Sequence, residues 1–221
     1  MSNDNLVTLT DPRSPTSEAY RTLRTNLEFF NLDEPIRTMV VTSPGAEEDK
    51  AAVLANLAVT LAQGGKRVVL IDCDLRYPIL HTLFGLENTA GFTTMILDKA
   101  ALANPPLHNT EVAGLRVLPA GPTPPNPAEL LGSRRIKEAI AVLLEQADML
   151  LFAAPPVLVV TDALVLAVQT DGLLLVTQAG STKREHVQRA KERLERVNVR
   201  IVGAVLNNAP ADRSLQGYYA V

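Results

Sequence analysis

Two patterns of hydrophobic and polar residues alternate along the chain. Short, continuous runs of Val, Leu and Ile are separated by longer segments in which apolar residues recur at helical spacing. Continuous apolar runs are typical of parallel strands buried on both faces, and the helical spacing indicates helices that cover those faces. The pattern therefore predicts an α/β, doubly wound fold with a mostly parallel sheet flanked by helices.

The boundaries of these segments follow from turn and capping residues. Strands are predicted over 36–43, 67–74, 115–121, 149–153, 172–178 and 199–207. Helices are predicted over 14–30, 50–64, 77–85, 91–98, 128–147, 161–169 and 181–198. Ser14 suits the N-cap of the first helix because its hydroxyl can accept a backbone N–H, and Pro15 suits the first turn.

Composition narrows the class of protein. With 221 residues, 47% of them hydrophobic, the chain suits one compact domain. A net charge of −3 provides no basic field for nucleic acid, and the single cysteine, Cys73, excludes an internal disulfide. The polar start lacks the apolar region of a signal peptide, and no apolar run reaches the roughly 20 residues that span a bilayer. We therefore expect a soluble, cytoplasmic protein without direct membrane insertion.

Polar residues follow several of the predicted strands. Asp72 and Asp74 end the second strand, Asn207 ends the last strand, and the first strand runs into the stretch 43–49. Ligands of doubly wound sheets bind outside the carboxyl ends of the strands. Two acids and an asparagine at that edge favour a metal–nucleotide pocket, in which Ala153 stands where another carboxylate would be expected.

The stretch "GAEEDKAA", residues 45–52, has the layout of a phosphate-binding loop but not its chemistry. A strand, a turn, a lysine and a helix follow one another, as in the motif that holds nucleotide phosphates. Lys50 is present. Asp49 stands where that motif has glycine, and Ala51 stands where it has a serine or threonine hydroxyl.

Several segments together resemble the bacterial tyrosine kinases (BY-kinases), P-loop NTPase-like proteins that control capsule and exopolysaccharide synthesis. They occur in family order: "SPTSEAYRTLRTNLEF", "LIDCDLRYP", "LPAGPTPPNPAELLGS", "DMLLFAAPPVLVVTDA" and "GAVLNN". The resemblance implies a single domain over 1–221. Its parts are an N-terminal extension at 1–13, an oligomerisation helix at 14–31, a P-loop-like core at 36–208 and a C-terminal tyrosine tail at 209–221.

The departures from the family pattern GPGEGKST remove specific functions. Asp49 adds a negative charge near the phosphates, which costs roughly 3 kcal/mol at about 5 Å and an effective dielectric of about 20. Ala51 and Ala153 lack the Mg²⁺ contacts that the family residues provide. Lys50, Asp72 and Asp74 are the remnants of the catalytic set. The resemblance thus implies a pseudokinase with a vestigial ATP/Mg site at Gly45, Lys50 and Asn207, and with no metal site.

Other interpretations stay open at this stage. The acidic stretch is also typical of a solvated turn. A second alternative is a cation site formed by Glu47, Glu48, Asp49 and Asp72. A third is weak nucleotide binding retained by Lys50 and Asn207. An active but atypical tyrosine autokinase or ATPase is the alternative function. A positioning ATPase is disfavoured, because Ala46 stands where those proteins carry an extra lysine.

The remaining family features concern assembly. Glu18, Arg21 and Arg24 match the Glu-x2-Arg-x2-Arg motif through which BY-kinase subunits form rings; an ordinary exposed ion pair is the alternative. Tyr218 and Tyr219 resemble a shortened form of the family's phosphorylated tail, or are incidental. The implied partners are further copies of the chain, a membrane adaptor of the polysaccharide co-polymerase type that recruits it to the inner face of the membrane, and an active BY-kinase.

Overall fold

The computed structural model describes residues 6–30 and 33–210. A seven-stranded sheet forms the centre, with strand order β3-β4-β2-β5-β1-β6-β7. Its strands are β1 (Thr38–Thr42), β2 (Val68–Asp72), β3 (His108–Asn109), β4 (Leu115–Leu118), β5 (Met149–Ala153), β6 (Gly172–Gln178) and β7 (Ile201–Asn207). All neighbouring strands are parallel except the short edge strand β3, which pairs antiparallel with β4.

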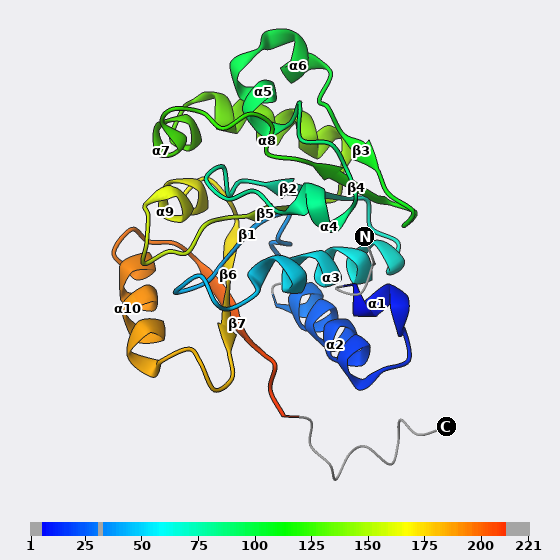
Figure 1. The fold of residues 1–221 in the computed structure, drawn as a ribbon, viewed down its shortest axis with the longest axis vertical. Coiled ribbons are helices and arrows are strands. Elements are labelled where there is room, and N and C mark those ends of the chain that lie inside the picture. The colour runs from blue at the N-terminus through cyan, green and yellow to red at the C-terminus, as the bar shows by residue number, and fades with distance from the viewer. Residues whose placement is uncertain (1–5, 31–32, 211–221) are drawn as a thin grey trace.

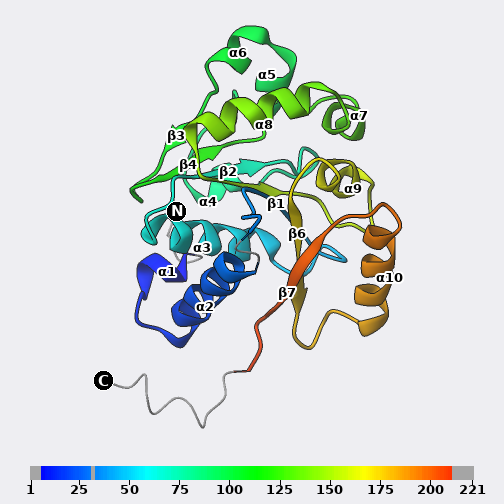
Figure 2. The same ribbon diagram turned by 180° about the vertical axis from the view of Figure 1, so that it is seen from behind.

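Helices cover both faces of this sheet (Figures 1 and 2). They are α1 (Val7–Thr10), α2 (Pro15–Phe29), α3 (Lys50–Gln63), α4 (Leu80–Leu83), α5 (Phe92–Leu97), α6 (Lys99–Ala103), α7 (Pro127–Leu131), α8 (Arg135–Gln146), α9 (Asp162–Ala167) and α10 (Arg184–Glu195). The predicted α/β fold with a mostly parallel sheet is confirmed.

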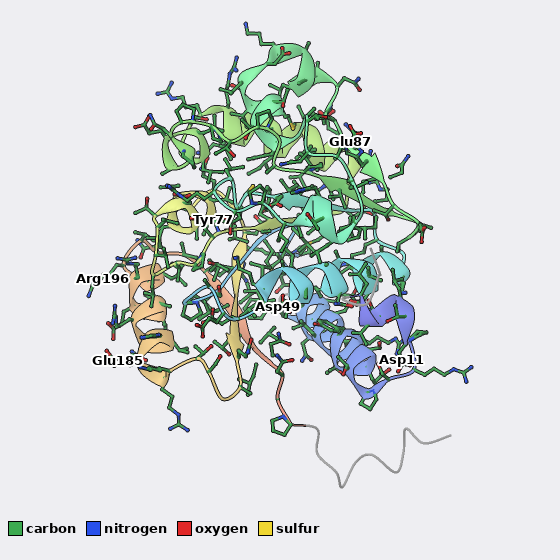
Figure 3. The ribbon with its side chains drawn as sticks, viewed as in Figure 1. Asp11, Asp49, Tyr77, Glu87, Glu185 and Arg196 are labelled. Atoms are coloured by element: carbon green, nitrogen blue, oxygen red, sulfur yellow. The ribbon has the colours of Figure 1, made fainter. Side chains whose placement is uncertain are left out.

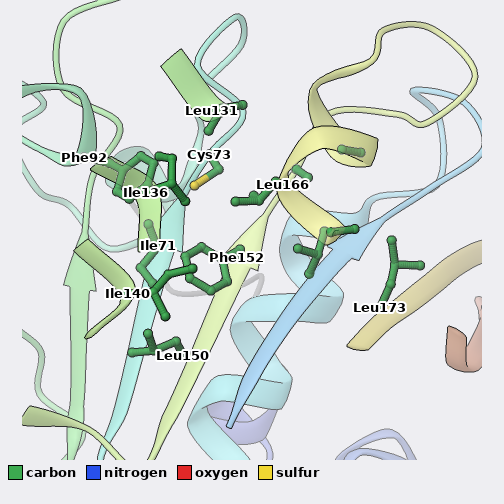
Figure 4. Close-up of a cluster of buried hydrophobic side chains, with 14 of the residues drawn as sticks. Ile71, Cys73, Phe92, Leu131, Ile136, Ile140, Leu150, Phe152, Leu166 and Leu173 are labelled. Carbon is green, nitrogen blue, oxygen red and sulfur yellow. The ribbon is translucent and has the colours of Figure 1, made fainter. Parts of the chain in front are cut away.

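Alternate residues of the strands pack into two separate hydrophobic cores, one on each face of the sheet. In β5, Leu150 and Phe152 pack with the face that carries α5, α8 and α9, whereas Leu151 packs with the face that carries α3 (Figure 4). This is the alternation expected of a strand covered on both sides. The central strands therefore read as continuous apolar runs, which is why the sequence pattern located them.

Helix α3 is buried on nearly all sides. It lies between the sheet and an outer layer formed by α1 and α2 (Figure 1). Its many alanines allow close packing against both layers. The Thr8 backbone N–H and hydroxyl both donate to Asn56 Oδ1 of α3, at 3.0 and 2.8 Å, so α1 is fixed to α3 by polar contacts as well.

Most predicted elements are present, with a few differences. The N-cap at Ser14 is confirmed, since its side chain accepts the Ser17 backbone N–H at 3.2 Å. The single helix predicted over 128–147 is wrong: α7 ends at Gly132, and α8 starts at Arg135. The Arg135 guanidinium donates to the Ile96 and Leu97 carbonyl groups, which helps to fix the start of α8.

The sequence pattern also missed some short elements, namely α1, α6 and β3. Each is too short to show a hydrophobic period. Across residues 6–30 and 33–210, no helix has the length and apolar character needed to cross a lipid bilayer.

Candidate functional site

The sheet order places the predicted polar residues at one edge. Strands β2, β5 and β1 are neighbours, so their carboxyl ends meet. Asp72 of β2 pairs directly with Ala153 of β5, and Val41 of β1 pairs with Ala153 from the other side. Asn207 reaches the same edge at the end of β7. The sheet thus brings the ends of these strands to one edge, whereas a nucleotide or metal site there stays a prediction.

Glu48 holds the β1–α3 loop, residues 43–49, in a folded conformation. Its buried Oε1 atom accepts the Gly45 backbone N–H at 3.2 Å and the Thr182 hydroxyl at 3.2 Å. Asn207 Nδ2 donates to the Glu48 carbonyl oxygen at 3.5 Å. An acidic side chain of the chain itself thus accepts a loop N–H of the kind that, in phosphate-binding loops, faces the phosphates.

Asp49 has a conformation that favours glycine. Its backbone lies in the left-handed region, with φ 49° and ψ 42°, immediately before α3 (Figure 3). For a residue with a Cβ atom this conformation costs roughly 1–2 kcal/mol. Burial raises the pKa of the Asp49 carboxyl, and the Ala52 N–H and the Lys50 ammonium oppose that shift. The loop therefore keeps a glycine-type turn while carrying an acidic side chain there.

Lys50 is engaged within the chain. Its Nζ atom lies 3.3 Å from Asp74 Oδ2, and both side chains are largely buried. The other carboxylate oxygen of Asp74 accepts the Tyr77 backbone N–H at 3.2 Å. The cation that would meet a phosphate is thus neutralised by a neighbouring acid.

Asp72 binds the backbone of the segment that follows β2. Its oxygens accept backbone N–H groups of Asp74 at 3.2 Å and of Ile79 and Leu80 at 2.9 Å each. Burial raises the pKa of this carboxyl to about 6, with a smaller contribution from Asp74, although the three N–H groups act in the opposite direction. Asp72 therefore stabilises the turn between β2 and α4.

The structure does not support a cation site in the loop. Among the described ranges there is no group of three His, Cys, Asp or Glu side chains placed to hold a metal ion. Glu47, Glu48, Asp49 and Asp72 are therefore not brought together as ligands, because Asp72 binds backbone N–H groups and Glu48 binds Gly45 and Thr182. Cys73 is fully buried.

Sequence reasoning missed one ion pair beside the site. The Arg76 guanidinium binds both carboxylate oxygens of Asp162, at 2.8 and 3.1 Å, and Asp162 is fully buried. The hydrogen bonds to Asp162 raise the pKa of Arg76. The pair ties the segment after β2 to the start of α9. Because its members lie 86 residues apart, no local pattern could have predicted the contact.

The residues assigned to oligomerisation lie on α2 but do not share one environment. Arg21 forms an ion pair with Glu18 at 2.7 Å, and both side chains are partly exposed. Arg24 instead donates to the Thr60 carbonyl oxygen of α3 at 2.9 Å. Arg24 is half-buried and contacts α3 of its own chain, whereas Glu18 and Arg21 contact each other. Tyr218 and Tyr219 lie outside the described residues.

Comparison with known proteins gives consistent matches. A ParA family model described as NUBPL iron-transfer P-loop NTPase matches residues 37–212. The tyrosine-protein kinase YwqD of Bacillus subtilis is 43% identical over 216 residues, which cover 97% of this chain and 91% of that protein. The putative tyrosine-protein kinase CapB of Staphylococcus aureus is 36% identical and covers 94% and 91%, respectively.

A solved structure also matches over most of the chain. The chimerical protein CapA2B2 superposes with a TM-score of 0.88 at 32% sequence identity, covering 94% of this chain and 91% of that one. The similarity therefore extends over nearly the whole chain.

Proposed function

Because the chain belongs to the bacterial tyrosine kinase family of P-loop proteins, we propose that it is a catalytically inactive member of that family. In this proposal it regulates or scaffolds capsular or exopolysaccharide synthesis by self-association and by binding a membrane adaptor or an active kinase. The observation that carries the proposal is the state of the β1–α3 loop. In this loop Asp49 holds a carboxylate at a glycine-type turn directly before Lys50, and Ala51 follows without a hydroxyl.

The loop's residues fit a nucleoside triphosphate poorly. Asp49 places a carboxylate where the backbone must approach the phosphates, and that repulsion is worth roughly 3 kcal/mol at about 5 Å. Glu48 and Asp74 both match the family pattern. Their contacts with the Gly45 N–H and with Lys50 therefore do not by themselves exclude a triphosphate.

The residues fit Mg²⁺ poorly as well. Ala51 opens α3 without a hydroxyl, and Ala153 ends β5 without a carboxylate. Asp72 lies beside Ala153, but its oxygens are hydrogen-bonded to backbone N–H groups. Mg²⁺ requires near-octahedral oxygen ligation, so missing protein ligands weaken its binding.

One observation favours the alternative of an active but atypical kinase. Position 49 keeps the left-handed backbone that a glycine would adopt, and Lys50 and Asp74 remain beside it. The frame of the loop is therefore present even though its chemistry has changed. A nucleotide-binding measurement separates the two functions.

The test is a calorimetric titration with ATP and Mg²⁺. The unmodified protein is expected to show no binding at physiological concentrations, because Asp49 repels phosphate and the metal lacks contacts at positions 51 and 153. The combined variant Asp49→Gly, Ala51→Ser, Ala153→Asp is expected to regain binding at least in part. Adding Lys50→Ala to that variant is the control, and it should remove the regained affinity. Micromolar Mg-ATP affinity of the unmodified protein would contradict the proposal.

A further inference from the structure

A small cavity lies at the amino edge of the sheet. It has a volume of about 140 Å³ and is lined by Leu6, Leu9, Phe84 and residues 109–112. These residues come from α1, from the end of α4 and from the turn between β3 and β4 (Figures 1 and 2). The turn precedes β4, whereas the loop with Lys50 follows β1, and the two strands run in the same direction. The cavity and the candidate site therefore lie at opposite edges of the sheet.

The cavity has the size of one side chain. An engineered protein cavity of about 150 Å³ holds a benzene-sized group, whereas sites for drug-sized molecules and cofactors measure roughly 300–1,000 Å³. Its lining is largely apolar: Leu6 is 2% exposed, and Leu9, Phe84 and Val112 are half-buried and pack against the same core. The cavity therefore suits a single aliphatic or aromatic side chain and is too small for a whole cofactor.

Hydrogen bonds fix the walls of this cavity. The Thr110 hydroxyl accepts the Val112 backbone N–H at 3.1 Å and donates to the Leu115 carbonyl oxygen at 3.0 Å, which holds the turn on one side. On the other side, the contacts of Thr8 with Asn56 hold α1 on α3. Because the walls are already ordered, filling the cavity costs little conformational entropy.

Two polar side chains without partners accompany the apolar lining. Asn109 and Glu111 are exposed, and neither has a hydrogen-bond or ion-pair partner among the described residues. No lysine or arginine occurs among the described residues that line the cavity. A carboxylate without a counter-charge beside an apolar cavity favours a ligand that carries a cation next to an apolar group.

The strand beside the cavity also has an unpaired edge. Strand β3 is the last strand of the sheet and pairs with β4 on one side only, within residues 6–30 and 33–210. The outward backbone groups of an edge strand can pair with an extended peptide. In that mode of binding, main-chain hydrogen bonds supply affinity and a neighbouring pocket supplies specificity for one side chain.

We propose that the cavity and the edge of β3 bind an extended peptide segment of a partner protein. An aliphatic or aromatic side chain of that segment fills the cavity, and a lysine or arginine of the segment pairs with Glu111. The site includes neither the β1–α3 loop nor the charged residues of α2. It goes beyond the proposed function, because it gives the chain a contact with a partner that does not depend on nucleotide or on self-association.

The first experiment selects the peptide. A display library of random decapeptides is panned against the whole protein, with counter-selection against Val112→Phe, because the larger side chain fills the cavity. Enriched peptides are expected to carry an aliphatic or aromatic residue within about two positions of Lys or Arg. Failure to enrich any peptide over the counter-selection, or enrichment of acidic peptides, would overturn the proposal.

The second experiment measures the affinity of a selected peptide by fluorescence anisotropy. Glu111→Lys is expected to weaken binding by about tenfold or more at unchanged Tm, since Glu111 is exposed and unpaired. Glu87→Lys is the matched control: it makes the same charge change at an exposed residue that does not line the cavity (Figure 3). Its affinity should stay within about threefold of the wild type. Equal losses in both variants would reduce the contact to general electrostatic attraction and overturn the proposal.

A third measurement locates the bound peptide. Binding is expected to slow amide hydrogen exchange in 107–112 by about fivefold or more, because the edge of β3 becomes paired. Removing residues 1–5 is expected to change the affinity by less than about threefold. Unchanged exchange in 107–112 would overturn the proposal. A tenfold gain in affinity without residues 1–5 would also overturn it, by showing that the chain's own N-terminal segment occupies the cavity.

Discussion

Single residues of the β1–α3 loop carry the strongest departures from the chemistry of the family. Asp49 has the backbone of a glycine and the side chain of an acid. We predict that Asp49→Gly increases the free energy of unfolding by about 1 kcal/mol, because glycine adopts φ 49° without a steric cost. Urea unfolding followed by circular dichroism measures the change.

Glu47→Gly is the matched control for that substitution. It removes the same charge from the same loop, and Glu47 is exposed like Asp49 but has no positive φ. No stabilisation is expected, since glycine there only adds conformational entropy to the unfolded chain. Equal stabilisation by both variants would show that the loop's charge, not the backbone at 49, sets the effect.

The raised pKa of the Asp72 carboxyl predicts that the stability of the folded protein depends on pH. Its pKa is about 6 in the folded protein, against an ordinary value of 3.8, so the folded state binds more protons between those two pH values. The stability contribution of Asp72 is therefore fully present below pH 4 and falls by up to about 3 kcal/mol as pH rises through 6.

The measurement for Asp72 is urea unfolding from pH 4 to 7. Asp72→Asn loses hydrogen bonds at every pH but cannot ionise, so the stability difference between wild type and variant should shrink as pH rises. The Asp148 carboxyl does not interfere with this measurement. Hydrogen bonds from Arg67 lower its pKa to about 2, so Asp148 stays ionised from pH 4 to 7. A difference that stays constant or grows with pH would contradict the raised pKa of Asp72.

At the scale of elements, the prediction concerns tyrosine phosphorylation in the segment that follows β7. If Tyr218 and Tyr219 are substrates of an active relative, a competent BY-kinase should phosphorylate them in trans, adding about −1.5 to −2 charges per site. Mass spectrometry after co-expression detects the modification. Combined Tyr218→Phe and Tyr219→Phe substitutions should remove most of the phosphate.

Tyr77 is a suitable control for that experiment. Its side chain is 83% exposed and lies beside the candidate site, so it is accessible to any kinase that acts without selectivity. Tyr77→Phe is expected to leave the level of phosphorylation unchanged. Modification confined to Tyr77, or none with a kinase that phosphorylates its own tail, would favour an incidental tail.

For the whole molecule, the prediction concerns the lifetime of its assemblies. The resemblance to BY-kinases implies that autophosphorylation disperses rings of active subunits. A subunit that cannot transfer phosphate would lack that release. We predict that light scattering detects an assembly at high protein concentration, and that Mg-ATP does not disperse it. An active BY-kinase treated in parallel is the control. Dispersal by Mg-ATP, or a monomer at every concentration, would contradict the scaffold.

The sequence by itself determined the elements and the family. Apolar periodicity located the central strands, and Ser14 and Pro15 fixed the start of α2, because both signals depend on neighbouring residues only. It also predicted that Asp72, Ala153 and Asn207 meet at one edge, since parallel strands share a carboxyl edge. The break at Gly132 was not predicted, because the flanking residues alone continue a helical pattern.

The tertiary structure alone decided which partners these residues choose. Lys50 pairs with Asp74, whereas Asp72 binds backbone N–H groups; Glu48 reaches Thr182, and Arg24 reaches the Thr60 carbonyl. Glu48 and Thr182 lie 134 residues apart, and Arg24 and Thr60 lie 36 apart. Such contacts depend on which strands are neighbours and on how an outer helix sits on α3. Local sequence encodes neither, because both follow from the packing of the whole chain.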